Sequence, residues 1–289
     1  MTYLLHLVTL IAIYSTLSIS LGLLVGQAGL FSLAQASFFA VGAYAVALNR
    51  ADTATLFWTT ISLGATLSAL SSLLVSLPSG KFRGDYFVLV TFSFQIITFD
   101  LLNNLSDYTK GSLGVTNIPP ANIFGWTISG VLGNALISVV LAVMAFFVVQ
   151  RLVTSPFGRV LRSIREDEMV ATATAHNVMA FKICAIAIAA SLSAVAGATY
   201  AHYFTYVDPT TFKISQSILV LAMVIIGGAE SRIGPIAGAA LLVLLPEAVR
   251  FLGLSDAAAG HIQQIFYGAL IAALMILRPQ GLFGRYGFS

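Results

Sequence analysis

The chain has 289 residues, of which 58% are hydrophobic and only 9% are charged, and its mean hydropathy is +0.94. Soluble proteins carry about 25% charged residues, so this composition excludes a soluble globular domain and predicts an all-α, polytopic membrane protein. The net charge of +3 is too small to suggest a nucleic-acid partner. With Cys184 as its one cysteine, the chain has no disulfide framework and no thiolate metal site. We therefore expect a single transmembrane domain over residues 1–289.

Nine apolar stretches approach or reach the roughly 20 residues that a helix needs to cross a bilayer. No basic region precedes the first and no Ala-x-Ala site follows it, so we interpret it as a true span rather than a signal peptide. Two of the nine are interrupted by glycine and could also be re-entrant. The predicted spans are 4–25, 26–48, 57–77, 86–104, 131–150, 180–203, 214–228, 235–252 and 262–278.

The basic residues indicate which span ends face the cytoplasm. Ten of them fall on one side and four on the other, so the positive-inside rule predicts an external N-terminus and a cytoplasmic C-terminus. A polar stretch rich in turn formers, residues 105–130, then becomes a long external loop. The cytoplasmic ten are Lys81, Arg83, Arg151, Arg159, Arg162, Arg165, Lys182, Arg232, Arg278 and Arg285; the external four are Arg50, Lys110, Lys213 and Arg250.

Glycine interrupts the apolar pattern near residues 26–29 and again at residues 227–235. In both places a glycine turn separates an apolar helix from a helix rich in small residues. This repetition predicts two glycine-broken helix pairs of the kind that transporters use, with a plain packing kink as the alternative. In the second turn we expect Glu230 to pair with Arg232. Close helix packing is assigned to Gly22, Gly26, Gly29, Ala36, Ala40, Ala43, Gly234 and Gly238.

Uncharged polar side chains lie near the first break and along the fourth span. They suit an apolar path for a neutral or zwitterionic substrate. Asp100 is the only acid inside its span, and it either faces the bundle or reaches the external interface, because an acid facing lipid is costly. The predicted substrate-path residues are Gln27, Gln35, Ser37, Gln95, Asp100 and Asn103.

The longest charged segment is residues 155–177, between the fifth and sixth spans. Within it Leu161, Ile164, Ala171 and Ala175 recur at spacings of three and four, which predicts an amphipathic helix of roughly six turns at the membrane surface. An ordinary cytoplasmic loop is one interpretation of this segment. The other interpretation is a docking surface for another protein.

Oppositely charged residues in this segment have helical spacing. We expect Arg162 to pair with Glu166 and Arg165 with Glu168, each pair contributing ~0.2–0.5 kcal/mol on a surface helix. If the segment is such a surface helix, both acids lie in water.

The chain has no motif for a chemical reaction. It lacks a phosphate-binding P-loop, a His-Glu-x-x-His zinc motif and a Gly-x-Ser-x-Gly elbow. The spans also lack the series of acids typical of a proton-driven carrier. We therefore predict a transport subunit rather than an enzyme, with its energy source in another protein.

Five stretches resemble, in order along nearly the whole chain, the signatures of LivM-type permeases. These permeases are membrane subunits of ATP-binding-cassette importers for branched-chain amino acids. The resemblance implies a homologous LivH-type permease partner, a periplasmic binding protein and two ATPase subunits in the bacterial inner membrane. It also implies that ATP binds to the ATPases, so that this chain needs no cofactor. The stretches are GQAGLFSLAQASFFAVGAY, RGDYFVLVTF, TKGSLGVTNIPP, SPFGRVLRSIREDE and GPIAGAALLVLLPEAVR.

By this resemblance, residues 155–177 are the coupling segment that docks on the ATPases. Glu168 and Ala171 fall where the importers' Glu-Ala-Ala motif would start. Ala175 and His176 depart from the family pattern, as do Ile96 and Phe99, and urea and short-amide permeases share the signatures. Such a permease, or an ion-coupled secondary carrier, is therefore the alternative function. The implied coupling residues are Arg159, Arg162, Arg165, Glu166, Asp167, Glu168 and Ala171.

Overall fold

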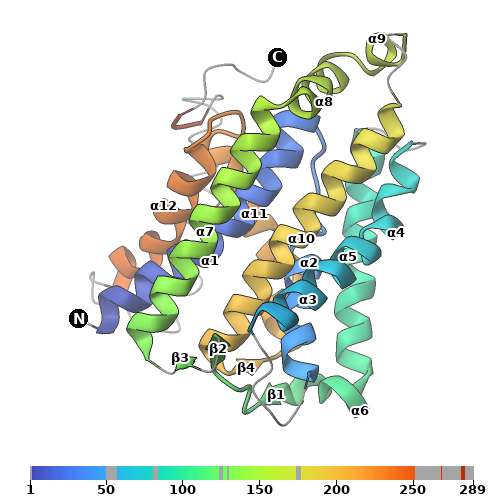
Figure 1. The fold of residues 1–289 in the computed structure, drawn as a ribbon. Coiled ribbons are helices and arrows are strands. Elements are labelled where there is room, and N and C mark those ends of the chain that lie inside the picture. The colour runs from blue at the N-terminus through green and yellow to red at the C-terminus, as the bar shows by residue number, and fades with distance from the viewer. Residues whose placement is uncertain are drawn as a thin grey trace.

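The computed structural model describes residues 2–49, 57–80, 84–123, 126–128, 130–173, 177–250, 268 and 281–283. In this part of the chain, helices run side by side between two ends of the molecule (Figure 1). The short strands and the N-terminus lie at one end, called the strand end here. Helices α8 and α9 lie at the other, called the α8 end. The prediction of an all-α, polytopic membrane protein is confirmed.

Five helical stretches in the described part of the chain are long and apolar enough to cross a membrane. Each corresponds to a predicted span. They are α1 (Thr2–Leu23) with the π-helical turn Leu24–Ala28; α3 (Phe57–Ser71) with α4 (Leu73–Ser76) and the 3-10 turn Pro78–Gly80; α5 (Asp85–Asn104); α7 (Val131–Thr154); and α10 (Val178–Phe204).

Three further apolar helices are shorter: α2 (Gln35–Leu48), α11 (Ile214–Gly227) and α12 (Gly234–Arg250). The glycine break predicted near residues 26–29 is followed by a non-helical stretch, residues 29–34, and α2 begins only at Gln35. At 1.5 Å per residue, α2 and α11 each reach ~21 Å, less than the ~30 Å of a hydrocarbon core. The predicted last span, residues 262–278, lies outside the described residues.

The predicted external loop, residues 105–130, contains regular secondary structure. It contains α6 (Ser106–Thr109), a 3-10 turn (Gly111–Leu113), β1 (Val115–Thr116), and the hairpin of β2 (Ala121–Ile123) with β3 (Trp126–Ile128). Strand β1 pairs antiparallel with β4 (Tyr206–Val207), which is followed by the 3-10 turn Pro209–Phe212. Val115, Ile118 and Ala121 are buried in the core. The loop therefore closes the strand end.

Helix α10 packs closely against α2 because two glycines let the backbones meet. A β-carbon on Gly197 would lie 1.9 Å from the carbonyl oxygen of Phe39, and one on Gly42 would lie 2.0 Å from that of Ala194. No side chain fits at such distances. Neither glycine was among the predicted packing residues, which shows that Gly-x-x-x-Gly spacing misses glycines that pair between different helices.

The predicted packing residues lie at close contacts. Ala36, Ala40 and Ala43 are at most 1% exposed. A β-carbon on Gly26 would lie 2.1 Å from the carbonyl oxygen of Ala229, so the first glycine break rests directly on the second. The remaining glycines, Gly22, Gly29, Gly234 and Gly238, would each place a β-carbon within 3 Å of another residue.

Candidate functional site

Gln95, in the middle of α5, joins the beginnings of two of the short helices, α2 and α11. Its Oε1 accepts hydrogen bonds from the backbone nitrogen and the hydroxyl of Ser37, both at 2.8 Å, and from the hydroxyl of Ser217 at 3.3 Å. Its Nε2 donates to the carbonyl oxygen of Phe212 at 2.7 Å. Gln95 thus caps α2 from another helix and holds the end of the 3-10 turn just before α11.

Ser217 and Thr91 complete this cap. The hydroxyl of Ser217 accepts from the backbone nitrogen of Ala36 at 2.9 Å, and that of Thr91 accepts from Leu33 at 3.0 Å. The first N–H groups of a helix have no partner within the helix, and lipid offers none. We name Ser37, Thr91, Gln95 and Ser217 the central clasp, because they supply the missing partners where α2 and α11 meet.

Gln35 lies beside the clasp and is fully buried. Its Nε2 donates to the hydroxyl of Ser20 at 2.7 Å, and Ser20 is 2.9 Å from the hydroxyl of Ser193. Its Oε1 is buried without a partner among the described residues. A line of polar groups therefore runs from α2 through α1 to α10.

The predicted path residues do not form a single site. Gln35, Ser37 and Gln95 are at most 1% exposed. Ser37 bonds to Gln95 and Gln35 bonds to Ser20 on α1, rather than lining an open path. Asp100 and Asn103 lie on the outer, exposed surface of α5. Of the two alternatives for Asp100, this exposure argues against the one in which it faces the interior of this subunit. Gln27 lies apart from all of them, in the π-helical turn at the α8 end.

The charged segment is two helices rather than one of about six turns. Helix α8 (Pro156–Glu166) ends at Asp167, whose backbone is extended with φ −155° and ψ 110°, and α9 (Glu168–Ala173) follows. The Asp167 carboxylate accepts from the backbone nitrogens of Met169 at 2.8 Å and Val170 at 3.2 Å. Asp167 therefore caps α9, and this competes with a continuous helix.

The buried stripe of this segment is as predicted. Leu161, Ile164 and Ala171 are at most 5% exposed and lie in one core cluster. Ala175 and His176 are outside the described residues. The opposite face is exposed, with Arg159, Arg162, Glu166 and Asp167.

Arg165 turns inward from α8 and contacts both glycine breaks. One guanidinium nitrogen donates to the carbonyl oxygen of Gly26 at 2.6 Å, and the other is hydrogen-bonded and ion-paired to Glu230. Gly29, with φ +66°, makes room for it, because a β-carbon there would lie 2.9 Å from the Arg165 side chain. Charge-assisted bonds of this kind are about twice as strong as neutral ones.

Three expected ion pairs are absent. Arg165 pairs with Glu230, so neither the Arg165–Glu168 pair nor the Glu230–Arg232 pair forms. Arg162 donates instead to the carbonyl oxygens of Val153 and Gly158. Arg165 reaches Gly26 and Glu230, and one of the two bonds of Arg162 reaches Val153 on α7. Spacing along α8 does not predict these partners.

Glu168 is not free in water. Its carboxylate lies 3.0 Å from the ammonium of Lys182 on α10, whose side chain is only 4% exposed. Sequence reasoning counted Lys182 as a cytoplasmic charge and missed this role. The available signal was its position just inside an apolar span, where a lysine needs a partner.

Residues 3–277 match the family model described as branched-chain amino acid transport system, permease component. Two proteins named high-affinity branched-chain amino acid transport system permease protein LivM, from Salmonella typhimurium and Escherichia coli, are each 32% identical, over 95% of this chain and 68% of theirs. A probable LivM permease from Methanocaldococcus jannaschii is 25% identical over 64% of this chain and 54% of its own length.

Proposed function

Since this chain belongs to the family of permease components of branched-chain amino acid transport systems, we propose that it forms half of the membrane path of an ATP-driven importer for these amino acids. The predictions of a LivM-type transport permease and of a multi-pass membrane protein are confirmed at the level of the family. The substrate, the partners and the bacterial inner membrane belong to this proposal.

The contact of Arg165 with both glycine breaks carries the proposal. A coupling helix must pass its movement to the membrane helices, and Arg165 connects α8 to the π-helical turn after α1 and to the turn between α11 and α12. Its side chain and that of Glu230 are 25% and 24% exposed, so the pair is shielded more than a surface ion pair. A displacement of α8 would therefore move both breaks together.

The exposed surface of the coupling segment supports docking of ATPase subunits. Met169 is 75% exposed and Val170 is 57% exposed, on a helix that lies beyond the membrane-spanning bundle (Figure 1). Exposed apolar side chains among charged ones are typical of a protein–protein contact. Arg159 and Glu166 lie exposed nearby on α8. One of two ATPase subunits would cover this surface, and the other would dock on the partner permease. Both would bind the ATP that drives transport.

The outer face of α5 supports a second, homologous permease of the LivH type. Only 17% of its membrane-spanning window is buried in this chain, the lowest share among the five long stretches. An acid and an amide exposed to lipid are costly, so Asp100 and Asn103 favour a protein or a water-filled path beside them. We infer that substrate delivered by a periplasmic binding protein passes along this face.

The test is reconstitution of the chain with the permease, ATPase and binding-protein subunits that co-purify from its native host. Uptake of labelled leucine into proteoliposomes should require ATP and should fall at least several-fold in Arg165→Gln. Arg151→Gln, which removes an exposed cation near the end of α7 and outside the coupling residues, is the matched control and should transport normally. If the proteoliposomes took up urea or acetamide with ATP but not leucine, the importer would remain and the proposed substrate would be wrong. Uptake by the isolated chain under an ion gradient alone would overturn the proposal.

A further inference from the structure

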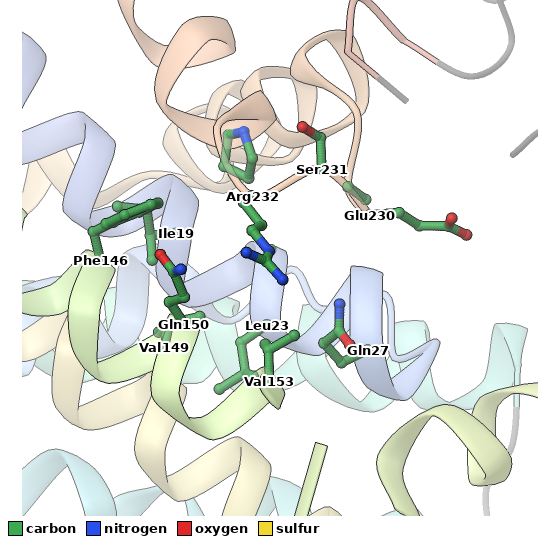
Figure 2. A pocket seen from close by; sticks show the side chains of 13 residues that line it. Ile19, Leu23, Gln27, Phe146, Val149, Gln150, Val153, Glu230, Ser231 and Arg232 are labelled. Carbon is green, nitrogen blue, oxygen red and sulfur yellow. The ribbon is translucent and has the colours of Figure 1, made fainter. Parts of the chain in front are cut away.

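A small cavity of about 40 Å³ lies at the α8 end, between α1, α7 and the turn that joins α11 to α12. Besides Glu230, four of its lining side chains are polar: Gln27, Gln150, Ser231 and Arg232 (Figure 2). They come from three separate parts of the chain. The cavity is therefore a place where distant polar groups converge.

The hydrogen-bonding capacity of these groups is largely unused within the described structure. Arg232 is exposed and has no hydrogen bond or ion pair to any described residue. Gln27 is only 7% exposed, and its Oε1 is buried with no partner among the described groups. The Ser231 hydroxyl accepts from the backbone nitrogen of Gly234 at 3.3 Å, which leaves its proton available.

The cavity also has no negative charge to balance Arg232. Glu230 is its only acidic lining residue, and Arg165 already neutralises it. In Figure 2 the Glu230 side chain points away, whereas Arg232 extends toward Leu23 and Val153. An uncompensated guanidinium with amides and a hydroxyl around it is suited to an anion such as a phosphate ester.

An apolar groove of about 280 Å³ adjoins the cavity and shares Ile19 and Phe146 with it. It lies between α1, α7 and α12, and its other residues include Val8, Ala12 and Ala142. From Val8 to Ile19 the groove follows α1 for ~16 Å. That length matches one leaflet, half of a hydrocarbon core of ~30 Å.

We propose that the cavity and the groove form one binding site for an anionic phospholipid from the leaflet at the α8 end. The phosphate accepts hydrogen bonds from Arg232 and from the amides of Gln27 and Gln150. One acyl chain lies in the groove between α1 and α7. A free phosphate would leave the groove unfilled, and a purely apolar ligand would leave Arg232 without a partner, so the combination favours a lipid.

The site adjoins the coupling contact. Glu230 and Ser231 are neighbours, the first held by Arg165 and the second lining the cavity. A lipid bound here would touch the same turn that α8 moves. The proposal does not depend on which substrate is carried.

The experiment measures lipid retention by native mass spectrometry of the full-length chain with its co-purifying subunits. Phosphatidylglycerol and phosphatidylcholine with identical acyl chains are added in competition. We expect the wild type to retain phosphatidylglycerol preferentially. Arg232→Gln should reduce that preference about fivefold, the effect of one interfacial cation. Arg159→Gln is the charge control and should leave the preference unchanged.

A second pair of variants tests the groove. Ala142→Leu fills it and should reduce retention of both lipids. Val140→Leu adds bulk on α7 at a 53% exposed position outside the groove and should reduce neither. Equal retention of the two lipids by the wild type would overturn the proposal. So would inorganic phosphate raising the thermal unfolding temperature as much as phosphatidylglycerol does.

Discussion

The ammonium of Lys182 lies 3.0 Å from the carboxylate of Glu168, and the two belong to different helices. Lys182 is inside α10, whereas Glu168 is the first residue of α9. The pair therefore attaches the exposed coupling segment to a membrane-spanning helix. Glu168 has a structural task as well as any role at the ATPase surface.

Glu168→Gln should destabilise the protein, because it leaves the buried ammonium of Lys182 without its counter-charge. Breaking a buried pair from one side costs ~3–5 kcal/mol, reduced here because Glu168 is partly exposed. Glu168→Lys should be worse, since it places two cations together. Thermal unfolding of the purified permease measures the effect. The combined variant Glu168→Gln with Lys182→Met should recover part of the lost stability. A double variant that unfolds at a lower temperature than either single variant would contradict the pairing.

Arg165→Gln and Glu230→Gln should not have additive effects on ATP-driven uptake. Each removes the same contact between α8 and the second glycine break, so the double variant should transport about as well as Arg165→Gln alone. Initial uptake rates at fixed protein and saturating ATP give the comparison. Two independent losses that multiply in the double variant would show that the residues act separately.

Gln95→Ala should lower stability and transport together. It removes the acceptor of Ser37 and Ser217 and the donor to Phe212, at a net cost of ~1 kcal/mol for each hydrogen bond. Ser93→Ala, on an exposed position of the same helix, is the control. The measurements are the unfolding temperature and leucine uptake. If Gln95→Ala folded normally and changed only substrate preference, Gln95 would line the path rather than hold the helices.

Gly42→Ala and Gly197→Ala should sharply reduce the yield of folded protein. The added methyl groups would lie 2.0 Å and 1.9 Å from backbone carbonyl oxygens, so α2 and α10 must separate. Overpacking typically costs ~1–3 kcal/mol, and backbone contacts cannot relax as side chains do. Gly130→Ala is the matched control, since no atom lies within 4 Å of a β-carbon there. Size-exclusion profiles of the three variants distinguish the cases, and three equal profiles would contradict the observed packing.

The sequence predicted what depends on local composition. Apolar length located the five long stretches, and spacing located the buried side of the coupling segment, including Leu161 and Ile164. Both signals come from neighbouring residues in the chain. They remain valid however the helices are arranged.

The contacts between distant segments could not be predicted in the same way. Arg165 and Glu230 are 65 residues apart, and a closer acid with helical spacing was available in Glu168. The expected Arg165–Glu168 pair assumed an unbroken helix. The extended backbone of Asp167 ends α8 between these two residues, so their helical spacing is lost. The glycines at residues 26–29 predicted a break before α2, but not the length of the non-helical stretch that follows them. Residues 29–34 are largely apolar, and hydropathy does not distinguish a non-helical backbone from a helix.

The cap on α2 also constrains the order in which the protein can be built. The backbone before Gln35 is not helical, and the nitrogen of Leu33 there donates to Thr91 on α5, while that of Ala36 at the start of α2 donates to Ser217 on α11. These partners are synthesised after α2, one of them about 180 residues later, as the sequence separation of 181 shows. The second span therefore cannot reach its final position during its own translation. A chain truncated after Phe204 should leave a cysteine at Ser32 open to water-soluble thiol reagents, whereas the complete chain should protect it.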